Sequence, residues 1–106
     1  MINLRKKGVN NMALGPSKWY VYIVCCRDST LYTGVTTDIS RRLNEHNNTS
    51  RGAKYTKRRR PVELVYWAEY ASRSEAQREE YRIKQLSKAE KELFVIANFH
   101  TLEAAE

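Results

Sequence analysis

Two tyrosines, an arginine and a histidine are spaced so that their side chains could act on a phosphate group. Tyr22 and Tyr32 are ten residues apart, and Arg42 and His46 are four residues apart. Residues i and i+4 of a helix share a face, so Arg42 could grip a phosphate through two hydrogen bonds while His46 donates to it or moves a proton. Taken singly, the tyrosine pair is typical of strand packing and the Arg–His pair of an exposed helix face.

A pair of glutamates in the second half of the chain could supply a metal ligand. Glu79 and Glu80 stand among the basic residues Arg78, Arg82 and Lys84. Mg²⁺ is commonly held by one or two carboxylates, with water and phosphate oxygens completing its coordination. The alternative is ordinary ion pairing along a helix, such as Glu80 with Lys84 at i, i+4.

The positive charge of the chain is concentrated in one short segment. Residues 51–60 hold six basic side chains and no acidic one, and Tyr55 stands among them. Over all 106 residues, 19 Lys and Arg face 12 Asp and Glu, a net charge of +7. Basic residues around an aromatic suit a loop that follows a nucleic-acid strand, so a polyanionic partner is favoured, nucleic acid before an acidic membrane surface. A charge that only keeps the protein soluble is the alternative.

Three strands are predicted from the hydrophobic pattern. Residues 19–26 (WYVYIVCC) are apolar or aromatic throughout, which indicates a strand covered on both faces. Residues 31–36 return after a four-residue polar link, so an antiparallel hairpin is expected, and Gly34 within it indicates a bulge or a close backbone approach. Residues 62–70 form the third strand, whose alternate residues share one face. That face would hold Val62, Leu64, Tyr66, Ala68 and Tyr70.

Helices are predicted where a capping residue precedes a helical pattern. Asp38 would cap a helix that runs to about residue 47. Ser72 and Ser87 would each begin a capping box, for helices to about residues 86 and 99. Residues 47–60, polar and basic before Pro61, are predicted as a loop. The order β-β-α-β-α-α indicates an α+β domain, a three-stranded antiparallel sheet flanked by helices.

The length of 106 residues fits one domain, which we predict over residues 19–99. Residues 1–18, basic and without periodicity, are predicted as a flexible extension, and residues 100–106 as a tail. No apolar run approaches the ~20 residues of a membrane-spanning helix, and the first residues lack the pattern of a secretory signal. The adjacent Cys25 and Cys26 favour a reducing cytoplasm, since neighbouring cysteines rarely meet disulfide geometry.

The order and spacing of the chemistry-bearing residues resemble the GIY-YIG nuclease family over about residues 19–98. The resemblance rests on Tyr20-Val21-Tyr22, on Tyr32-Thr33-Gly34, on Arg42 eight residues beyond that glycine, and on a glutamate in a later helix. The stretches LYTGVTTDISRRLNEH, GAKYT and EYRIKQLSK look like the small single-domain bacterial branch of the family. The first motif departs at its Gly and Ile and the second at its Ile, and the frequent Asn after the metal-binding helix has no obvious counterpart.

The resemblance implies a role for each of five residues. Tyr22 and Tyr32 would line the active site, and Arg42 would hold the scissile phosphate. His46 occupies a position that related nucleases fill with Tyr or His. The second glutamate of the pair, Glu80, matches the single metal ligand, for one Mg²⁺ or Mn²⁺ ion. The nucleic-acid contacts that we expect are Thr37, Arg41, Arg51, Lys54, Tyr55, Lys57, Arg58 and Arg59.

The implied activity is that of a metal-dependent endonuclease. It would hydrolyse DNA phosphodiesters with weak sequence specificity, or with a preference for single-stranded or branched structures, in repair, recombination or DNA uptake. Either Tyr32 or His46 could take the proton from water: a tyrosine base predicts an alkaline optimum, and a histidine with a pKa of about 6.5 predicts a plateau from near pH 7. The alternatives are a non-catalytic nucleic-acid-binding module and a nuclease subunit that needs a protein partner for targeting. We expect a monomer without membrane association.

Overall fold

The computed structural model describes residues 18–104 and has the α+β architecture expected from the sequence. Its strands and helices follow one another in the predicted order, with one short helix added between the first long helix and the third strand. The elements are β1 (Trp19–Cys25), β2 (Leu31–Thr36), α2 (Ile39–Asn48), α3 (Lys54–Lys57), β3 (Glu63–Tyr70), α4 (Arg73–Lys84) and α5 (Lys88–Ala104).

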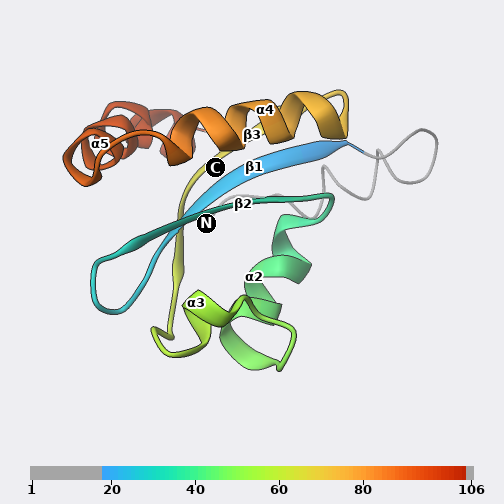
Figure 1. Cartoon of the computed structure of the whole chain (residues 1–106), viewed down its shortest axis with the longest axis vertical. Coiled ribbons are helices and arrows are strands. Elements are labelled where there is room, and N and C mark those ends of the chain that lie inside the picture. The colour runs from blue at the N-terminus through green and yellow to red at the C-terminus, as the bar shows by residue number, and fades with distance from the viewer. Residues whose placement is uncertain (1–17, 105–106) are drawn as a thin grey trace.

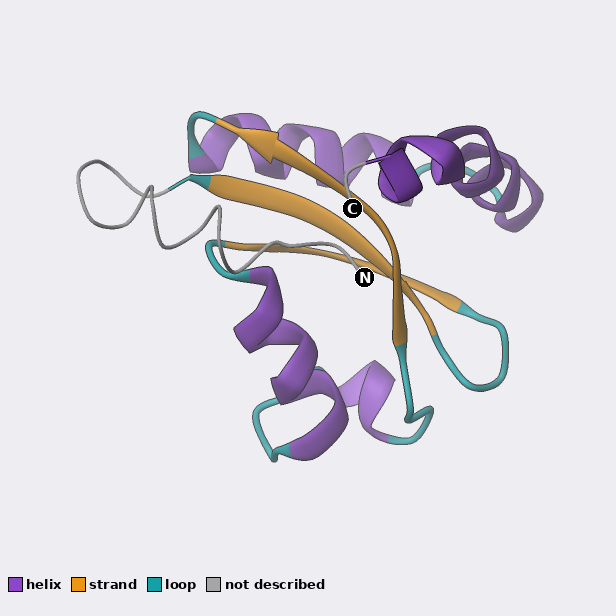
Figure 2. Cartoon of the chain, turned by 180° about the vertical axis from the view of Figure 1, so that it is seen from behind, coloured by secondary structure: helices purple, strands orange, loops and turns teal. Residues whose placement is uncertain are grey.

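The three strands form one antiparallel sheet with the order β2-β1-β3. The apolar strand β1 takes the central place, as expected of a strand covered on both faces. Helices α4 and α5 lie on one side of the sheet, and α2 and α3 lie on the other (Figure 1). The view from behind shows the same two layers (Figure 2). Tyr22 of β1 lies opposite Gly34 of β2 and Trp67 of β3, at the middle of the sheet.

Strand β3 does not keep the alternation predicted for it. The register against β1 shifts between Ile23, which pairs with Tyr66, and Val24, which pairs with Leu64, so Val65 is an extra residue in the ladder. Val65 and Tyr66 therefore both pack against the apolar cluster beneath α4 and α5. The predicted face is wrong for its first two members, since Val62 and Leu64 pack with Tyr22 and Val24 on the other side.

The capping residues act as the sequence predicts. The Asp38 carboxylate accepts a hydrogen bond from the Arg41 amide at 3.0 Å at the start of α2. Ser72 accepts from the Glu75 amide at 3.2 Å at the start of α4. The Ser87 hydroxyl oxygen likewise accepts an amide hydrogen bond, 3.1 Å long, from three residues ahead at the start of α5. Helix α5 continues to Ala104, beyond the predicted end near residue 99 and into the segment predicted as a tail.

The segment predicted as a plain loop, residues 47–60, contains α3 and is tied to the end of α2. The Arg60 Nε donates to the His46 carbonyl at 2.6 Å, and its Nη2 donates to the carbonyls of Glu45, at 3.2 Å, and Thr49. A guanidinium at this place satisfies the open carbonyls of the last helical turn and suits the negative end of the helix dipole. The guanidinium of Arg60 therefore binds backbone carbonyls of its own domain.

The predicted extension lies almost entirely outside the described residues. Lys18 is described, and its ammonium pairs with the Glu69 carboxylate at 3.2 Å. Among residues 18–104 no helix is long and apolar enough to cross a membrane. Cys25 and Cys26 are both free thiols.

Candidate active site

The hydroxyl of Tyr22 is the centre of the polar side of the sheet. Tyr22 is only 3% exposed, and its hydroxyl lies 2.7 Å from His46 Nε2. The ring has room because Gly34 stands opposite it on β2: a Cβ at that position would lie 2.5 Å from the Tyr22 hydroxyl oxygen. The close approach predicted at Gly34 is therefore made by a side chain, and any larger residue there would displace the tyrosine.

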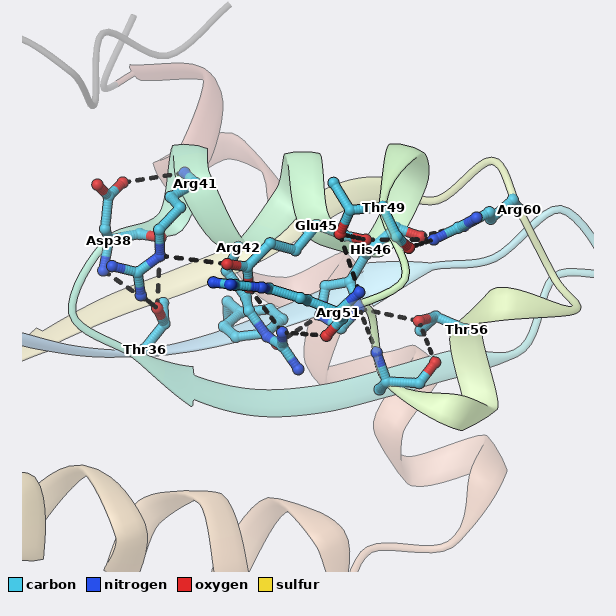
Figure 3. Close-up of polar contacts among 12 residues, drawn as sticks. Thr36, Asp38, Arg41, Arg42, Glu45, His46, Thr49, Arg51, Thr56 and Arg60 are labelled. Carbon is cyan, nitrogen blue, oxygen red and sulfur yellow. Dashed lines mark hydrogen bonds and ion pairs between the residues drawn. The ribbon is translucent and has the colours of Figure 1, made fainter.

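His46 reaches Tyr22 from α2 and is itself completely buried. Its Nδ1 lies 2.8 Å from the Thr56 hydroxyl oxygen of α3, so both ring nitrogens are engaged (Figure 3). Burial, with help from the nearby Arg42 guanidinium, lowers the pKa of His46 to about 4. The ordinary pKa assumed for this histidine is therefore wrong, because a site without solvent disfavours the imidazolium.

The charged side chains of Arg42 and Glu80 change the pKa of the Tyr22 hydroxyl. Burial raises the pKa of Tyr22 to about 12, the Arg42 guanidinium opposes that rise, and the neighbouring Tyr32 and, to the smallest extent, the Glu80 carboxylate add to it. The two side chains come from α2 and α4, which lie on different sides of the sheet. Charged groups from two helices, α2 and α4, thus act on one phenol.

Arg42 is held in place by its own helix and by the loop that follows. Its Nη1 donates to the Glu45 carboxylate at 2.7 Å and to the Arg51 carbonyl at 2.9 Å (Figure 3). The Arg42 side chain is 24% exposed, so the guanidinium is fixed without being sealed from solvent. Such a guanidinium can still offer its other N–H groups to a phosphate.

Tyr32 lies beside this group on β2 and is partly exposed. Its ring centroid lies 5.3 Å from that of His46, 6.5 Å from that of Tyr22 and 5.9 Å from that of Tyr55. Its hydroxyl makes no hydrogen bond to any residue from 18 to 104, in contrast to the doubly engaged Tyr22–His46 pair. A water or substrate oxygen can therefore reach Tyr32 more easily than it can reach His46.

Glu80 and Glu79 face different neighbours although they are adjacent on α4. Glu79 pairs with Arg82 and raises the pKa of Tyr66, after the larger effect of burial. Glu80 is the glutamate that acts on Tyr22, and its carboxylate pairs with Lys84 at 2.9 Å. The two glutamates, which the sequence distinguishes only through the family resemblance, therefore have different partners in the structure.

The Glu80 carboxylate suits a hard cation that takes only one or two of its ligands from the protein. Within the described chain no three His, Cys, Asp or Glu side chains lie together as a metal cluster. Mg²⁺ does not need one, since it is often bound through one or two carboxylates and completed by water and phosphate oxygens. The Glu80 side chain is 22% exposed, and its partner Lys84 is 48% exposed and flexible, so the carboxylate can exchange that ion pair for a metal.

Residues 18–93 match the GIY-YIG catalytic domain, and this match spans most of the chain. The chain belongs to the GIY-YIG family. It is similar to the UPF0213 protein DP2720 of Desulfotalea psychrophila, with 56% identity over 80 residues, 76% of this chain and 73% of that protein. It is also similar to the UPF0213 protein VNG_2274C of Halobacterium salinarum, with 56% identity over 73 residues, 69% of this chain and 94% of that protein.

Two solution NMR structures share the fold of this GIY-YIG domain. The UPF0213 protein BH0048 of Bacillus halodurans is 44% identical, with a TM-score of 0.52 over 77% of this chain and 86% of that one. The protein EF2693 of E. faecalis is 39% identical, with a TM-score of 0.56 over 81% of this chain and 90% of that one. A catalytic domain of this family indicates a nuclease that acts on nucleic acid.

The basic residues expected to contact nucleic acid divide into two groups in this GIY-YIG domain. Lys54, Lys57 and Arg58 are exposed and make no ion pair or hydrogen bond through their side chains to residues 18–104. Arg59, by contrast, donates to Asp28 at 3.1 Å and lies 3.9 Å above the centre of the Tyr55 ring. These three exposed cations, on α3 and directly after it, are called the basic surface below.

Three other expected contacts lie on α2 or in the segments on either side of it. Arg41 is exposed at the start of α2, where its Nη2 donates to Thr36 at 3.3 Å. Thr37 is half-buried just before the cap of the same helix, and Arg51, whose backbone carbonyl accepts from Arg42, is exposed. Figure 3 shows Arg41 near the start of α2 and Arg51 beside Arg42.

Sequence reasoning missed three residues that shape the site. Thr56 was passed over as part of a basic loop, although it is fully buried and contacts His46. Glu45, three residues after Arg42, orients that guanidinium. Arg60 was counted with the basic run although it caps α2. The i, i+3 spacing could have revealed Glu45, whereas the other two depend on how the loop folds back.

Proposed function

We propose that this protein is a metal-dependent endonuclease that hydrolyses DNA phosphodiester bonds. We further propose that it has weak sequence specificity, or prefers single-stranded or branched DNA. The observation that supports this most is the buried, hydrogen-bonded Tyr22–His46 pair together with Arg42, whose guanidinium is held by its own domain and still open to solvent. A binding module would need the basic surface but not a fixed guanidinium together with a buried, hydrogen-bonded phenol.

Arg42 would stabilise the reacting phosphate. Negative charge builds up on the non-bridging oxygens as water attacks, and a guanidinium already fixed in place need not reorganise to meet it. Glu45 and the Arg51 carbonyl supply that fixation through one nitrogen of the fork. The remaining N–H groups would face the substrate.

Tyr32 is our choice for the base that takes a proton from water. Its hydroxyl is free of described partners and partly exposed, whereas His46 is completely buried with both nitrogens engaged. A phenol base predicts a rate that keeps rising into alkaline pH. A direct base at His46, with its pKa of about 4, would instead give a plateau that begins near pH 5.

Glu80 would hold one Mg²⁺ or Mn²⁺ ion. Such an ion supplies Lewis-acid stabilisation of the phosphate and of the leaving oxygen. The Glu80 carboxylate would give up its pairing with Lys84 to do so, and Lys84 would remain nearby as an exposed cation. Tyr22 would keep its place at the floor of the site through His46.

The exposed cations of α3 and the turn after it would follow the DNA backbone. Contacts from Lys54, Lys57 and Arg58 carry no sequence information by themselves, because phosphates are the same at every step. This is the physical reason to propose weak specificity. Such a small domain, with a reducing cytoplasm as its proposed location, could work alone as a monomer or be guided by a protein partner.

Paired variants at the two adjacent glutamates test this proposal. End-labelled single-stranded, duplex and branched DNA, and RNA, are incubated with wild type, Glu80→Gln and Glu79→Gln in Mg²⁺, Mn²⁺ or EDTA. We expect cutting of DNA that needs metal, falls at least about 100-fold in Glu80→Gln and survives in Glu79→Gln. The same assay from pH 5 to pH 10 separates the two candidate bases.

Each other outcome points to a different conclusion. Cutting that persists in Glu80→Gln at the wild-type rate would contradict the assignment of the metal ligand. Salt-sensitive binding without cutting of any substrate would favour the binding module or a partner-dependent subunit. RNA cut faster than every DNA would overturn the substrate class while leaving the reaction intact.

A further inference from the structure

We propose that Thr56 is a positioning residue that fixes His46 as the Nδ1–H tautomer and so directs the hydroxyl proton of Tyr22 onto His46 Nε2. In this arrangement the lone pairs of the Tyr22 oxygen are left for donors on the substrate side. The benefit for catalysis rests on the proposed nuclease function, but the tautomer itself does not. Thr56 sits in α3, an element that the sequence pattern did not predict.

The direction of this series of hydrogen bonds is set at the contact between Thr56 and Ala53. The Thr56 hydroxyl oxygen lies 2.9 Å from the Ala53 carbonyl oxygen. Two oxygens at that distance need a proton between them, and a carbonyl has none to give. The single hydroxyl proton of Thr56 is therefore donated to Ala53.

The next contact follows from the first. With its proton committed, the Thr56 oxygen can only accept, so the 2.8 Å contact with His46 requires a proton on Nδ1. The Ala53 amide also approaches Nδ1, at 3.5 Å, and would prefer that nitrogen unprotonated. That contact is beyond the usual range of 2.7–3.2 Å and is the weaker of the two.

The contact between Tyr22 and His46 agrees with this direction. A neutral histidine protonated at Nδ1 has an accepting Nε2, which suits donation from the Tyr22 hydroxyl at 2.7 Å. Arg42, which lowers the pKa of the Tyr22 hydroxyl, has only donors and cannot accept its proton. Tyr22 thus donates to His46, its lone pairs stay open to donors, and every hydrogen in these contacts has one consistent place.

The loop holds Thr56 firmly enough to serve this purpose. Gly52 packs so closely that a Cβ there would lie 2.7 Å from the Glu45 carbonyl oxygen and 3.0 Å from the Cα of His46. Arg60 closes the same loop onto the last turn of α2. Thr56 is fully buried between these two anchors, so its oxygen and the imidazole are fixed relative to one another.

The wild-type protein gives the first test without any substitution. Long-range ¹H–¹⁵N correlation spectra of the ¹⁵N-labelled full chain at pH 7 report which ring nitrogen of each histidine carries the proton. His100 is the other histidine of the sequence, and His100→Gln assigns the signals. We expect the protonated nitrogen of His46 to be Nδ1. A proton on Nε2, or an even mixture of the two forms, would overturn the proposal.

Substitutions at Thr56 then test its part in the tautomer. Thr56→Val removes the hydroxyl and keeps the shape, and we expect it to lose the pure Nδ1–H form and to cut DNA about 100-fold more slowly, with DNA binding in EDTA unchanged. Thr56→Ser keeps the hydroxyl and should restore both the spectrum and the rate. A Val variant with the wild-type tautomer and rate would overturn the role of Thr56.

The outcomes separate this proposal from the proposed function. If Thr56→Val fails to fold, the wild-type and Thr56→Ser spectra still decide the tautomer. If the wild type shows the Nδ1–H form and cuts no nucleic acid, the nuclease proposal fails while the tautomer stands. If it cuts DNA with a proton on Nε2, the reverse holds.

Discussion

The two faces of the central strand β1 are built from opposite chemistry. On the side of α4 and α5, Val21 and Ile23 are completely buried in an apolar cluster with Ala76 and Ile83. On the side of α2 and α3, Tyr22 is buried against a histidine and, through it, a threonine, with a hydrogen bond at each contact. Neighbouring residues of one strand therefore serve two different purposes.

The difference shows where stability and chemistry are located in the domain. In an apolar cluster a cavity lowers the stability, but no hydrogen-bond donor has to be matched with an acceptor. A buried polar chain needs every donor and acceptor matched, because a single orphan costs about 1–3 kcal/mol. In the described residues no buried side-chain nitrogen or oxygen lacks a partner, so the polar face meets that demand. Substitutions on the two faces should therefore separate loss of folding from loss of activity.

The largest effect on stability should come from the apolar face. Ile23→Ala removes a completely buried side chain, and we expect the free energy of unfolding to fall by about 3 kcal/mol. DNA cleavage per folded molecule should change little at low temperature. Its partner variant Tyr22→Phe should do the opposite: a loss of cleavage with a stability change of only about 1 kcal/mol. Denaturant unfolding and cleavage assays check the pair, and equal effects of both variants on both readouts would erase the distinction.

Gly34 offers the next largest effect, on activity. Gly34→Ala places a Cβ 2.5 Å from the Tyr22 hydroxyl oxygen, so the ring must leave its place against His46. We expect the cleavage rate to fall about 100-fold, the scale of an ångström-sized misplacement. The control Val35→Ala changes the adjacent residue of β2 on the apolar face and should mainly cost stability. A Gly34→Ala enzyme with wild-type activity would mean that the position of the Tyr22 hydroxyl is unimportant.

Acid should destabilise the polar face through His46. Its pKa is about 4 in the folded protein against about 6.5 unfolded, so the unfolded chain takes up a proton first as the pH falls. The stabilisation is complete above pH 6.5 and declines from there toward pH 4. Between pH 7 and pH 5 we expect a loss of about 2 kcal/mol.

Urea unfolding at several pH values measures this loss. His46→Gln should flatten the dependence between pH 7 and pH 5, since glutamine does not titrate. Carboxylates with lowered pKa values, such as Asp28 and Glu45, lose their stabilising effect at lower pH, and they are unchanged in His46→Gln. An unchanged slope in His46→Gln would show that another group carries the acid sensitivity.

The smallest effect concerns DNA affinity. In a Glu80→Gln background, which should leave DNA intact, Arg58→Ala should lower the magnitude of the slope of log K against log[salt] by about 1. Arg60→Ala should leave that slope unchanged and lower stability, because Arg60 binds carbonyls of α2. Filter binding across salt concentrations checks both, and equal slope changes would place Arg60 on DNA.

The sequence was informative wherever a local rule decides the structure. The strands, the caps Asp38, Ser72 and Ser87 and the shared face of Arg42 and His46 depend on neighbours within one element. The resemblance to the GIY-YIG family is confirmed by the match over residues 18–93. The roles of the individual site residues remain predictions.

The rest depended on contacts between segments distant in the chain. The bulge at Val65 arises from pairing with β1, which periodicity within β3 does not reveal. The burial of His46, and hence its low pKa, requires α3 to fold back over α2. The inward turn of Arg60 follows from the same fold, so a count of positive charges overstates the surface available to DNA.

The hold of Arg60 on the last turn of α2 also joins two parts of the protein into one unit of local unfolding. When the basic segment detaches, the turn that carries His46 loses its cap and the imidazole loses Thr56. Segments tied in this way open together. Binding of a nucleic-acid backbone by the basic segment and correct placement of Tyr22 should therefore be gained and lost together.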